Sequence, residues 1–150
     1  MTSTDTGRLG LGPIDQVSYV VDDMAASLPQ YEAIYGLFEV GEAPMDNCAI
    51  RGSNTDCKLK VAVNRSGPVE VELIEVLEGD TPHSEHLRQH GEGLHHVRFR
   101  VSSLDEKLAE LKEAGFDVVF EKRFGPSVAF AYLETPAAIG RSLIELLEMP

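Results

Sequence analysis

The chain has 150 residues, of which 43% are hydrophobic, enough for one domain with a buried core or for two small modules sharing one core. Its 13 Lys and Arg against 25 Asp and Glu give a net charge of -12, which opposes sequence-independent binding to nucleic acid or to an anionic membrane. No apolar run is long enough for a transmembrane helix, and the N-terminus lacks the apolar centre of a signal peptide. We therefore expect a cytoplasmic protein with a disordered lead-in over residues 1–12, and expect Cys48 and Cys57 to be reduced.

The first structured segments are a strand and a helix. Residues 14–21 alternate in hydrophobicity, which is typical of a strand. An amphipathic pattern predicts a helix over 24–35, closed by Gly36. Pro29 inside that pattern predicts either a kink or a helix that begins near Ser27.

Three further strands are predicted before the middle of the chain. Residues 37–40 begin the first, and the polar segment 41–54 is interpreted as a strand edge and a mobile loop. Strands follow over 58–63 and 69–77, joined by a turn. Alternation along the last strand places Glu70 and Glu72 beside large aliphatic residues on one face and Glu75 beside them on the other. A carboxylate is therefore buried on either face, which is unfavourable unless it is paired or binds a metal.

A short polar segment separates the two halves. Thr81 is a suitable N-cap and Pro82 a suitable first residue for a helix that continues to His90. His83, His86 and His90 share one face of this helix, a spacing compatible with a metal site. Because the helix is polar on every side, we interpret the three histidines as solvent-exposed.

The segment 91–101 combines a glycine-rich entry with period-two alternation, which is typical of a strand with one face on the core and one on a cleft. The polar face carries His96, Arg98 and Arg100, and the apolar face carries Val97, Phe99 and Val101. An imidazole and two guanidinium groups on one face suit the binding of a metal or an anion. The alternative is a half-exposed edge strand.

The second half of the chain repeats the first. Residues 96–103 match 16–23 position by position, and each segment is followed by an amphipathic helix that ends in a glycine. The second helix is predicted over 104–114, with Leu104, Leu108 and Leu111 as its buried stripe. Strands follow over 118–121 and 129–133, and residues 145–148 near the end match 72–75.

A repeat that occurs twice indicates two paired modules rather than a longer array. We predict an α+β fold in which two tandem βαβββ modules form a curled mixed sheet around a metal-binding cleft. The single domain spans 13–150, with module 1 at 13–79, a linker helix at 80–91 and module 2 at 92–149.

Equivalent positions of the two modules carry groups that can bind a metal. Gln16 matches His96, and Glu72 matches Glu145. Two carboxylates, one imidazole and one amide oxygen form a donor set that suits Zn, Ni, Co, Mn or Fe and leaves room for water or substrate oxygens.

The tandem modules, the segment Gly91-Glu92-Gly93-Leu94-His95-His96-Val97, the opening Ile14-Asp15-Gln16-Val17 and the close Leu143-Ile144-Glu145-Leu146 resemble the vicinal oxygen chelate superfamily of glyoxalases, bleomycin-resistance proteins and dioxygenases. Within it, the chain is most similar to methylmalonyl-CoA epimerases over residues 12–148. This resemblance implies Gln16, Glu72, His96 and Glu145 as ligands of one divalent ion, which we predict to be Zn, Ni, Co or Mn.

Two departures from the epimerases stand out. They usually carry histidine where this chain has Gln16, so the ligand set looks like that of the zinc glyoxalase I enzymes. Some of them also have a further carboxylate on the strand before Glu72, and the segment 58–63 offers none.

The donor set suits proton removal next to a metal-chelated carbonyl, because a divalent ion stabilises the resulting enolate. The resemblance gives Glu145 the role of base, and Glu72 is placed to return the proton on the other face. The leading hypothesis is an isomerase or epimerase of a small acid or acyl-CoA. The alternatives are a glyoxalase I-type lyase acting on a thiol adduct and a metal-free module that binds small molecules. A ring-cleaving dioxygenase is disfavoured, because such sites in the superfamily resemble two histidines and one glutamate.

A small anionic or thioester substrate needs local positive charge in so acidic a protein. Arg98 is the first candidate, Arg100 the second, and Lys122 and Arg123 are the next. The competing interpretation pairs Arg98 with Glu72 or Glu75 on a neighbouring strand. Open sheet edges and the resemblance both predict a homodimer.

Overall fold

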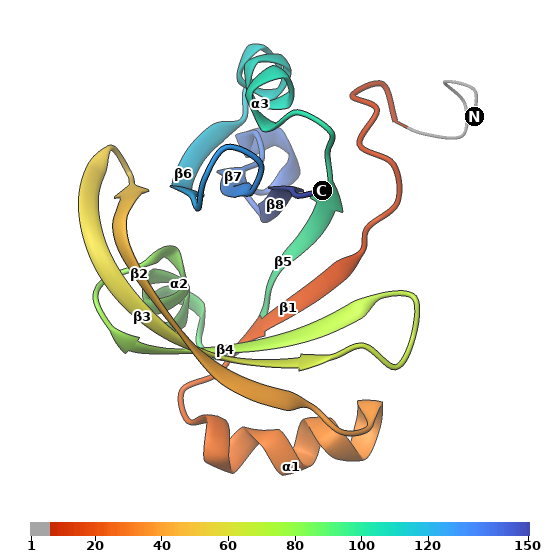
Figure 1. Cartoon of the computed structure of the whole chain (residues 1–150), viewed down its shortest axis with the longest axis vertical. Helices are drawn as coiled ribbons and strands as arrows, with labels where there is room; N and C mark the ends of the chain where they lie inside the picture. Colours follow the sequence, from red (N-terminus) through yellow and green to blue (C-terminus); the bar gives the residue numbers. More distant parts are fainter. Residues whose placement is uncertain (1–6) are drawn as a thin grey trace.

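Two copies of a strand–helix–three-strand unit form the chain, as the computed structural model shows for residues 7–150 (Figure 1). The first unit comprises β1 (Gln16–Val20), α1 (Met24–Tyr35), β2 (Glu39–Ile50), β3 (Ser53–Asn64) and β4 (Glu70–Glu78). After α2 (Pro82–His90), the second comprises β5 (Gly93–Arg100), α3 (Leu104–Glu113), β6 (Asp117–Arg123), β7 (Ala129–Glu134), η1 (Ala137–Ile139) and β8 (Leu143–Glu148). The predicted α+β fold with tandem βαβββ modules is confirmed.

The eight strands curl into a closed barrel with the order β1-β4-β3-β2-β6-β7-β8-β5. The antiparallel pair β1–β5 joins the two modules, and each of these strands has a parallel neighbour from its own module, β4 or β8. On the opposite side of the barrel, β2 meets β6 through the pairs Ala49–Glu121 and Ile50–Phe120. Because the barrel is closed, open sheet edges no longer support a homodimer. The homodimer stays a prediction.

Each long helix covers the outside of its own module (Figure 1). The α1 side of the sheet buries Val21, Met24, Val71 and Leu73, and the predicted stripe of α3 packs on the outer faces of β5, β7 and β8. None of the helices within residues 7–150 is long and apolar enough to span a membrane.

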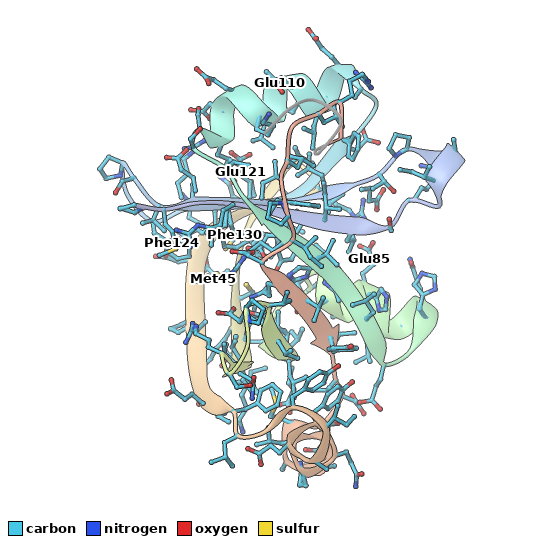
Figure 2. All side chains as sticks on the ribbon, turned by 90° about the vertical axis from the view of Figure 1, so that its right-hand side faces the viewer. Met45, Glu85, Glu110, Glu121, Phe124 and Phe130 are labelled. Carbon is cyan, nitrogen blue, oxygen red and sulfur yellow. The ribbon has the colours of Figure 1, made fainter. Side chains whose placement is uncertain are left out.

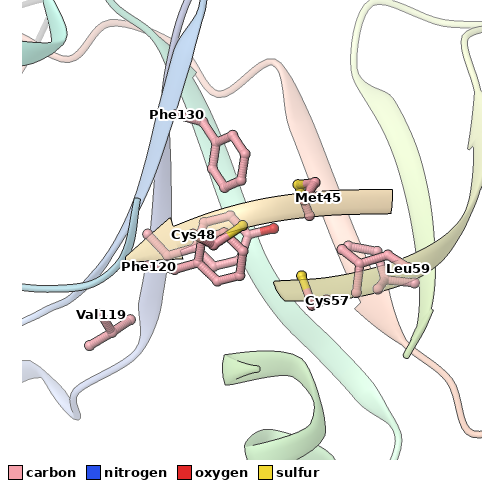
Figure 3. Close-up of a cluster of buried hydrophobic side chains, with 9 residues drawn as sticks. Met45, Cys48, Cys57, Leu59, Val119, Phe120 and Phe130 are labelled. Atoms are coloured by element: carbon pink, nitrogen blue, oxygen red, sulfur yellow. The ribbon is translucent and has the colours of Figure 1, made fainter. Parts of the chain in front are cut away.

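The inside of the barrel has an apolar half and a polar half. Side chains of β2, β3, β6 and β7 fill the apolar half, where Met45, Cys57, Phe120 and Phe130 point toward one another (Figure 3). Phe124 stacks beside Phe130 at 6.0 Å between ring centroids, with Met45 nearby (Figure 2). The polar half is formed by β1, β4, β5 and β8, the four strands around the junction of the modules. The predicted metal ligands Gln16, Glu72, His96 and Glu145 all lie on these four strands.

Two local predictions differ from the structure. The segment 41–54, predicted as a strand edge and mobile loop, lies mostly in the twelve-residue strand β2, because β3 pairs along its length and accommodates Pro44 opposite Lys58. Helix α1 begins at Met24, where the Asp23 side chain accepts hydrogen bonds from Ala25 N and Ala26 N, so a start near Ser27 is wrong.

The predicted disordered lead-in falls partly on residues 1–6, which lie outside the described residues. In its remainder, Leu9 and Leu11 pack against the core beneath α3, and Lys107 Nζ donates to Leu9 O at 3.0 Å. The packing contacts of Leu9 and Leu11 therefore lie before residue 13, where the domain was predicted to begin.

Gly79 provides the turn that carries the chain from β4 into α2. Its φ is +91°, and an added Cβ would lie 2.7 Å from the backbone oxygen of Asp56. Gly140 has the same φ of +91° but no atom within 4 Å of an added Cβ. Substitutions at the two positions can therefore distinguish the free-energy cost of backbone strain from that of a steric clash.

We expect Gly140→Ala to lower the free energy of unfolding by about 1–2 kcal/mol through strain alone. Gly79→Ala should cost about 1–3 kcal/mol more, because the strand beneath must move. Urea unfolding of both variants measures the difference, and equal losses would contradict the close approach of β3 to this turn.

Candidate metal centre

The four predicted ligands meet inside the barrel around the Nε2 atom of His96. This atom lies 3.1 Å from Gln16 Oε1, 2.9 Å from Glu145 Oε1 and 3.8 Å from Glu72 Oε1. Gln16 is fully buried, and His96 and Glu145 are 1% and 7% exposed. Four side chains that are far apart in the sequence thus place their donor atoms in one buried space.

Neighbouring residues orient two of these side chains. Gln16 Nε2 donates to Glu70 Oε1 at 2.6 Å, which directs the amide oxygen of Gln16 at His96. Ser18, two residues along β1, donates from its hydroxyl to Glu72 Oε1 at 2.8 Å. The register places Ser18 opposite Glu72 on β4 and opposite His96 on β5, so one strand orients ligands on both sides.

The hydrogen positions on His96 follow from its neighbour His95. His95 Nε2 lies 3.3 Å from Pro82 O, and a carbonyl oxygen only accepts, so Nε2 carries the hydrogen. Burial lowers the pKa of His95 well below its usual value, so the ring is neutral and its Nδ1 is an acceptor. His95 Nδ1 lies 2.9 Å from His96 Nδ1, which must therefore carry the donated hydrogen. In the tautomer with its only ring hydrogen on Nδ1, His96 has a lone pair on Nε2 that is directed into the centre.

These four atoms fit the coordination sphere of a divalent ion. With a hydrogen-free His96 Nε2, all four present lone pairs, which repel one another at these distances unless a positive charge, such as a metal ion or a proton on Nε2, lies between them. With metal–ligand bonds of about 2.0–2.2 Å, adjacent ligands lie about 2.8–3.6 Å apart. The observed separations from His96 Nε2, 2.9 to 3.8 Å, are close to this range. The hydrogen bond that the far nitrogen of this ring, His96 Nδ1, donates to His95 is also the usual support for a metal-binding histidine.

The surroundings of Glu72 disfavour the charged form of its carboxylate. The pKa of Glu72 is raised to about 7, mainly by burial and also by the Glu145 carboxylate, while His96 and Ser18 act in the opposite direction. Two carboxylates in a buried space favour any cation that neutralises them.

A second group of histidines adjoins this centre. Nitrogen atoms of His83, His95 and His96 lie within 4.8 Å of one another, a grouping that could itself hold a metal ion. The interpretation of the α2 histidines as solvent-exposed is wrong for His83, which is fully buried because the first turn of α2 packs against the barrel. His83 Nδ1 contacts Thr81 Oγ1 at 3.2 Å and its Nε2 contacts Tyr132 Oη at 3.0 Å. Both nitrogens of His83 thus already have protein partners.

Arg98 lies beside the centre but is occupied by carboxylates. Its Nε and Nη2 donate to the two oxygens of Asp15 at 2.9 and 3.3 Å, and its Nη1 lies 3.7 Å from Glu70 Oε1. The alternative that pairs Arg98 with a carboxylate is thus observed, although the partners are Asp15 and Glu70 rather than Glu72 or Glu75. Its predicted role in binding substrate stays a prediction.

The other predicted basic residues lie in separate surroundings. Lys122 Nζ lies 3.5 Å from Asp46 Oδ1 and 5.6 Å from the centre of the Phe124 ring. Arg123 pairs with Asp105 at the start of α3, and Arg100 lines a surface groove with Lys107 and Glu110. The structure therefore brings Arg98 alone of the four next to the metal ligands.

Sequence reasoning missed several groups around the centre. They are Asp15, Ser18, Glu70, His95 and Tyr132. Ser18 and Glu70 share the inward face with predicted ligands two residues away, so the period-two pattern contained this information. For Tyr132, the sequence indicated only that a tyrosine in a buried strand needs a hydrogen-bond partner.

Two known proteins are similar to the chain in sequence. The uncharacterized protein YqjC of Bacillus subtilis (strain 168) is 26% identical over 137 residues, which cover 90% of this chain and 91% of that protein. The 4-hydroxyphenylpyruvate dioxygenase of Caenorhabditis briggsae is 30% identical over 155 residues, covering 97% of this chain and only 37% of the dioxygenase.

Solved structures share the fold. A hypothetical protein from Bacillus halodurans has a TM-score of 0.67 at 22% identity and covers 92% of this chain and 94% of its own. The methylmalonyl-CoA epimerase from Mycobacterium tuberculosis has a TM-score of 0.65 at 22% identity, covering 91% and 87%. A Streptomyces coelicolor methylmalonyl-CoA epimerase variant, solved in complex with 2-nitronate-propionyl-CoA, has a TM-score of 0.61 at 26% identity, covering 91% and 97%.

A model of a protein superfamily also matches the chain. It covers residues 15–132, from β1 into β7, and includes the predicted ligands Gln16, Glu72 and His96. The resemblance to the vicinal oxygen chelate proteins is thereby confirmed: the chain belongs to the Glyoxalase/Bleomycin resistance protein/Dioxygenase superfamily.

Proposed function

We propose that the chain is a divalent-metal-dependent isomerase that removes a proton from the carbon next to a chelated carbonyl, as an epimerase does. The observation that carries this proposal is the convergence of Gln16, Glu72, His96 and Glu145 within 3.8 Å of His96 Nε2. A bound divalent ion would polarise the carbonyl and stabilise the enolate. The four side chains would hold that ion.

The two glutamates are suited to proton transfer on opposite faces of a substrate. Glu72 comes from β4 and Glu145 from β8, the strands that flank the central pair β1–β5. They therefore reach the centre from opposite sides. Glu145 would take the proton from the carbon, and Glu72 would return it on the other face, a division that inverts the configuration without a third carboxylate.

An acyl thioester is the substrate class that we favour. The Streptomyces coelicolor epimerase that is 26% identical binds 2-nitronate-propionyl-CoA, and another epimerase, 25% identical with a TM-score of 0.57, was solved with methylmalonyl-CoA. Asp15 and Glu70 already neutralise Arg98. The positive charge that receives a substrate carboxylate would therefore come from the metal ion.

Gln16 favours a second candidate, a glyoxalase I-type lyase acting on a thiol adduct. Its amide oxygen is buried and lies 3.1 Å from His96 Nε2, where the epimerases resembled by this chain usually carry a histidine. Both reactions begin with proton removal next to a carbonyl. They differ in whether the proton returns to the same carbon or to its neighbour, so the labelled position in the product separates them.

Replacing His96 tests the metal centre. After loading with Co²⁺ and desalting, we expect about one ion per chain in the wild type and at least a 100-fold loss of affinity in His96→Ala, because an essential ligand is gone. His90→Ala, on the exposed end of α2, serves as the matched control and should load fully. Elemental analysis gives the ratio, and full loading of His96→Ala would rule out this centre.

Replacing the two glutamates tests the chemistry. In D₂O, the metal-loaded wild type should introduce deuterium at C2 of methylmalonyl-CoA, as followed by mass spectrometry. Glu145→Gln and Glu72→Gln should each slow this exchange by about 10²–10⁴-fold, because an amide takes up no proton. Glu78→Gln, an exposed neighbour at the end of β4, should exchange at the wild-type rate. Exchange that persists unchanged in both site variants would contradict the assignment of the bases.

A further inference from the structure

The first turn of α2 reaches into the barrel and contacts Tyr132. Thr81 and His83 are 1% and 0% exposed, and Tyr132 on β7 is 4% exposed. They form a continuous chain in which Thr81 Oγ1 meets His83 Nδ1 at 3.2 Å and His83 Nε2 meets Tyr132 Oη at 3.0 Å. In a chain of buried neutral groups, each hydrogen has one consistent position.

The N-cap role of Thr81 decides where these hydrogens lie. Its Oγ1 already accepts from the backbone N–H groups of His83 and Ser84, which uses both of its lone pairs. Its own hydroxyl hydrogen therefore points at His83 Nδ1, which must accept. The single hydrogen of the neutral His83 ring is then on Nε2 and is donated to Tyr132 Oη.

This assignment leaves the phenolic hydrogen of Tyr132 available. Oη accepts from His83, so its own hydrogen points away from α2, on the other side of the phenol oxygen. Within residues 7–150, His83 is the hydrogen-bond partner that the structure gives to this hydroxyl. A buried donor without an acceptor is unfavourable, and a ligand oxygen would satisfy it.

Tyr132 lies at the border between the apolar half of the barrel and the metal centre. Its ring centroid is 4.7 Å from that of His96 and 5.2 Å from that of Phe120. On the neighbouring strand β8, the residue paired with Tyr132 is Glu145, the proposed base. A substrate that is chelated at the centre would therefore lie next to the phenol.

We propose that Tyr132 donates a hydrogen bond to the enolate oxygen that forms on the substrate, and that His83 is the positioning residue that turns the phenolic hydrogen toward it. This inference rests on the proposed function and adds a catalytic donor to it. Such a donor acts more strongly on the enolate than on the neutral carbonyl, because negative charge develops on the oxygen.

Tyr132→Phe removes the donor and keeps the ring. We expect unchanged metal content, about 100-fold slower deuterium exchange and similarly weaker binding of 2-nitronate-propionyl-CoA, whose planar anion resembles the enolate. Binding of propionyl-CoA, which carries no such charge, should change less than about threefold. Tyr35→Phe, at the end of α1 where the hydroxyl contacts Tyr19 Oη at 3.1 Å, is the control and should match the wild type. Wild-type affinity of Tyr132→Phe for the nitronate would overturn the proposal.

Replacing His83 tests whether it positions the phenol. His83→Leu removes the hydrogen bond to Tyr132, whereas His83→Gln retains an N–H donor. We expect His83→Leu to weaken nitronate binding about tenfold and His83→Gln to restore most of it, with metal content unchanged in both. Equal affinities of the two variants for the nitronate would contradict the positioning role.

A measurement without substrate separates this inference from the proposed function. Nitrogen-15 spectra of the metal-loaded wild type, assigned with His83→Gln, should show a neutral His83 with its hydrogen on Nε2. A hydrogen on Nδ1 would overturn the inference even if exchange is fast. A wild type that neither exchanges deuterium nor binds the nitronate would refute the proposed function, and the inference with it.

Discussion

Four electron-donating atoms in one largely buried space are the constraint on which the rest of the structure depends. Gln16, Glu72 and Glu145 direct oxygen atoms at His96 Nε2, and hydrogen bonds from Gln16 to Glu70 and between His95 and His96 prevent the groups from turning away. Such an arrangement favours a cation at its middle. The centre is therefore organised for a positive charge before any substrate arrives.

The repeat explains how the chain builds this centre. Because β1 and β5 pair across the module junction, with β4 and β8 on either side, each module contributes one ligand from its first strand and one from its last. The modules have diverged in the apolar half, where β2, β3, β6 and β7 pack aromatic and sulfur-containing side chains against one another. Helix α2, which belongs to neither copy, closes the remaining space and supplies His83 and the carbonyl of Pro82 to the hydrogen-bond network.

Much of this arrangement could be predicted from the sequence, because alternation and the repeat both report which residues share a face. The positions of Gln16, Glu72, His96 and Glu145 follow from these two patterns alone. Strand β2 could not be predicted in this way, because Pro44 and the polar residues around it are typical of a loop. Only the pairing with β3 makes this segment a strand. His83 was missed because α2 is polar overall, and periodicity does not show that its first turn enters the barrel. The pairing of Arg98 with Asp15 depends on the register between β1 and β5, which a single sequence does not define.

Locating the ion directly tests the central claim best. Crystals of the cobalt-loaded protein, measured on both sides of the cobalt absorption edge, would place the metal without reference to any substrate. We predict one anomalous peak about 2.0–2.2 Å from Gln16 Oε1, His96 Nε2 and one oxygen each of Glu72 and Glu145. A peak among His83, His95 and His96 instead, or at the surface, would contradict it.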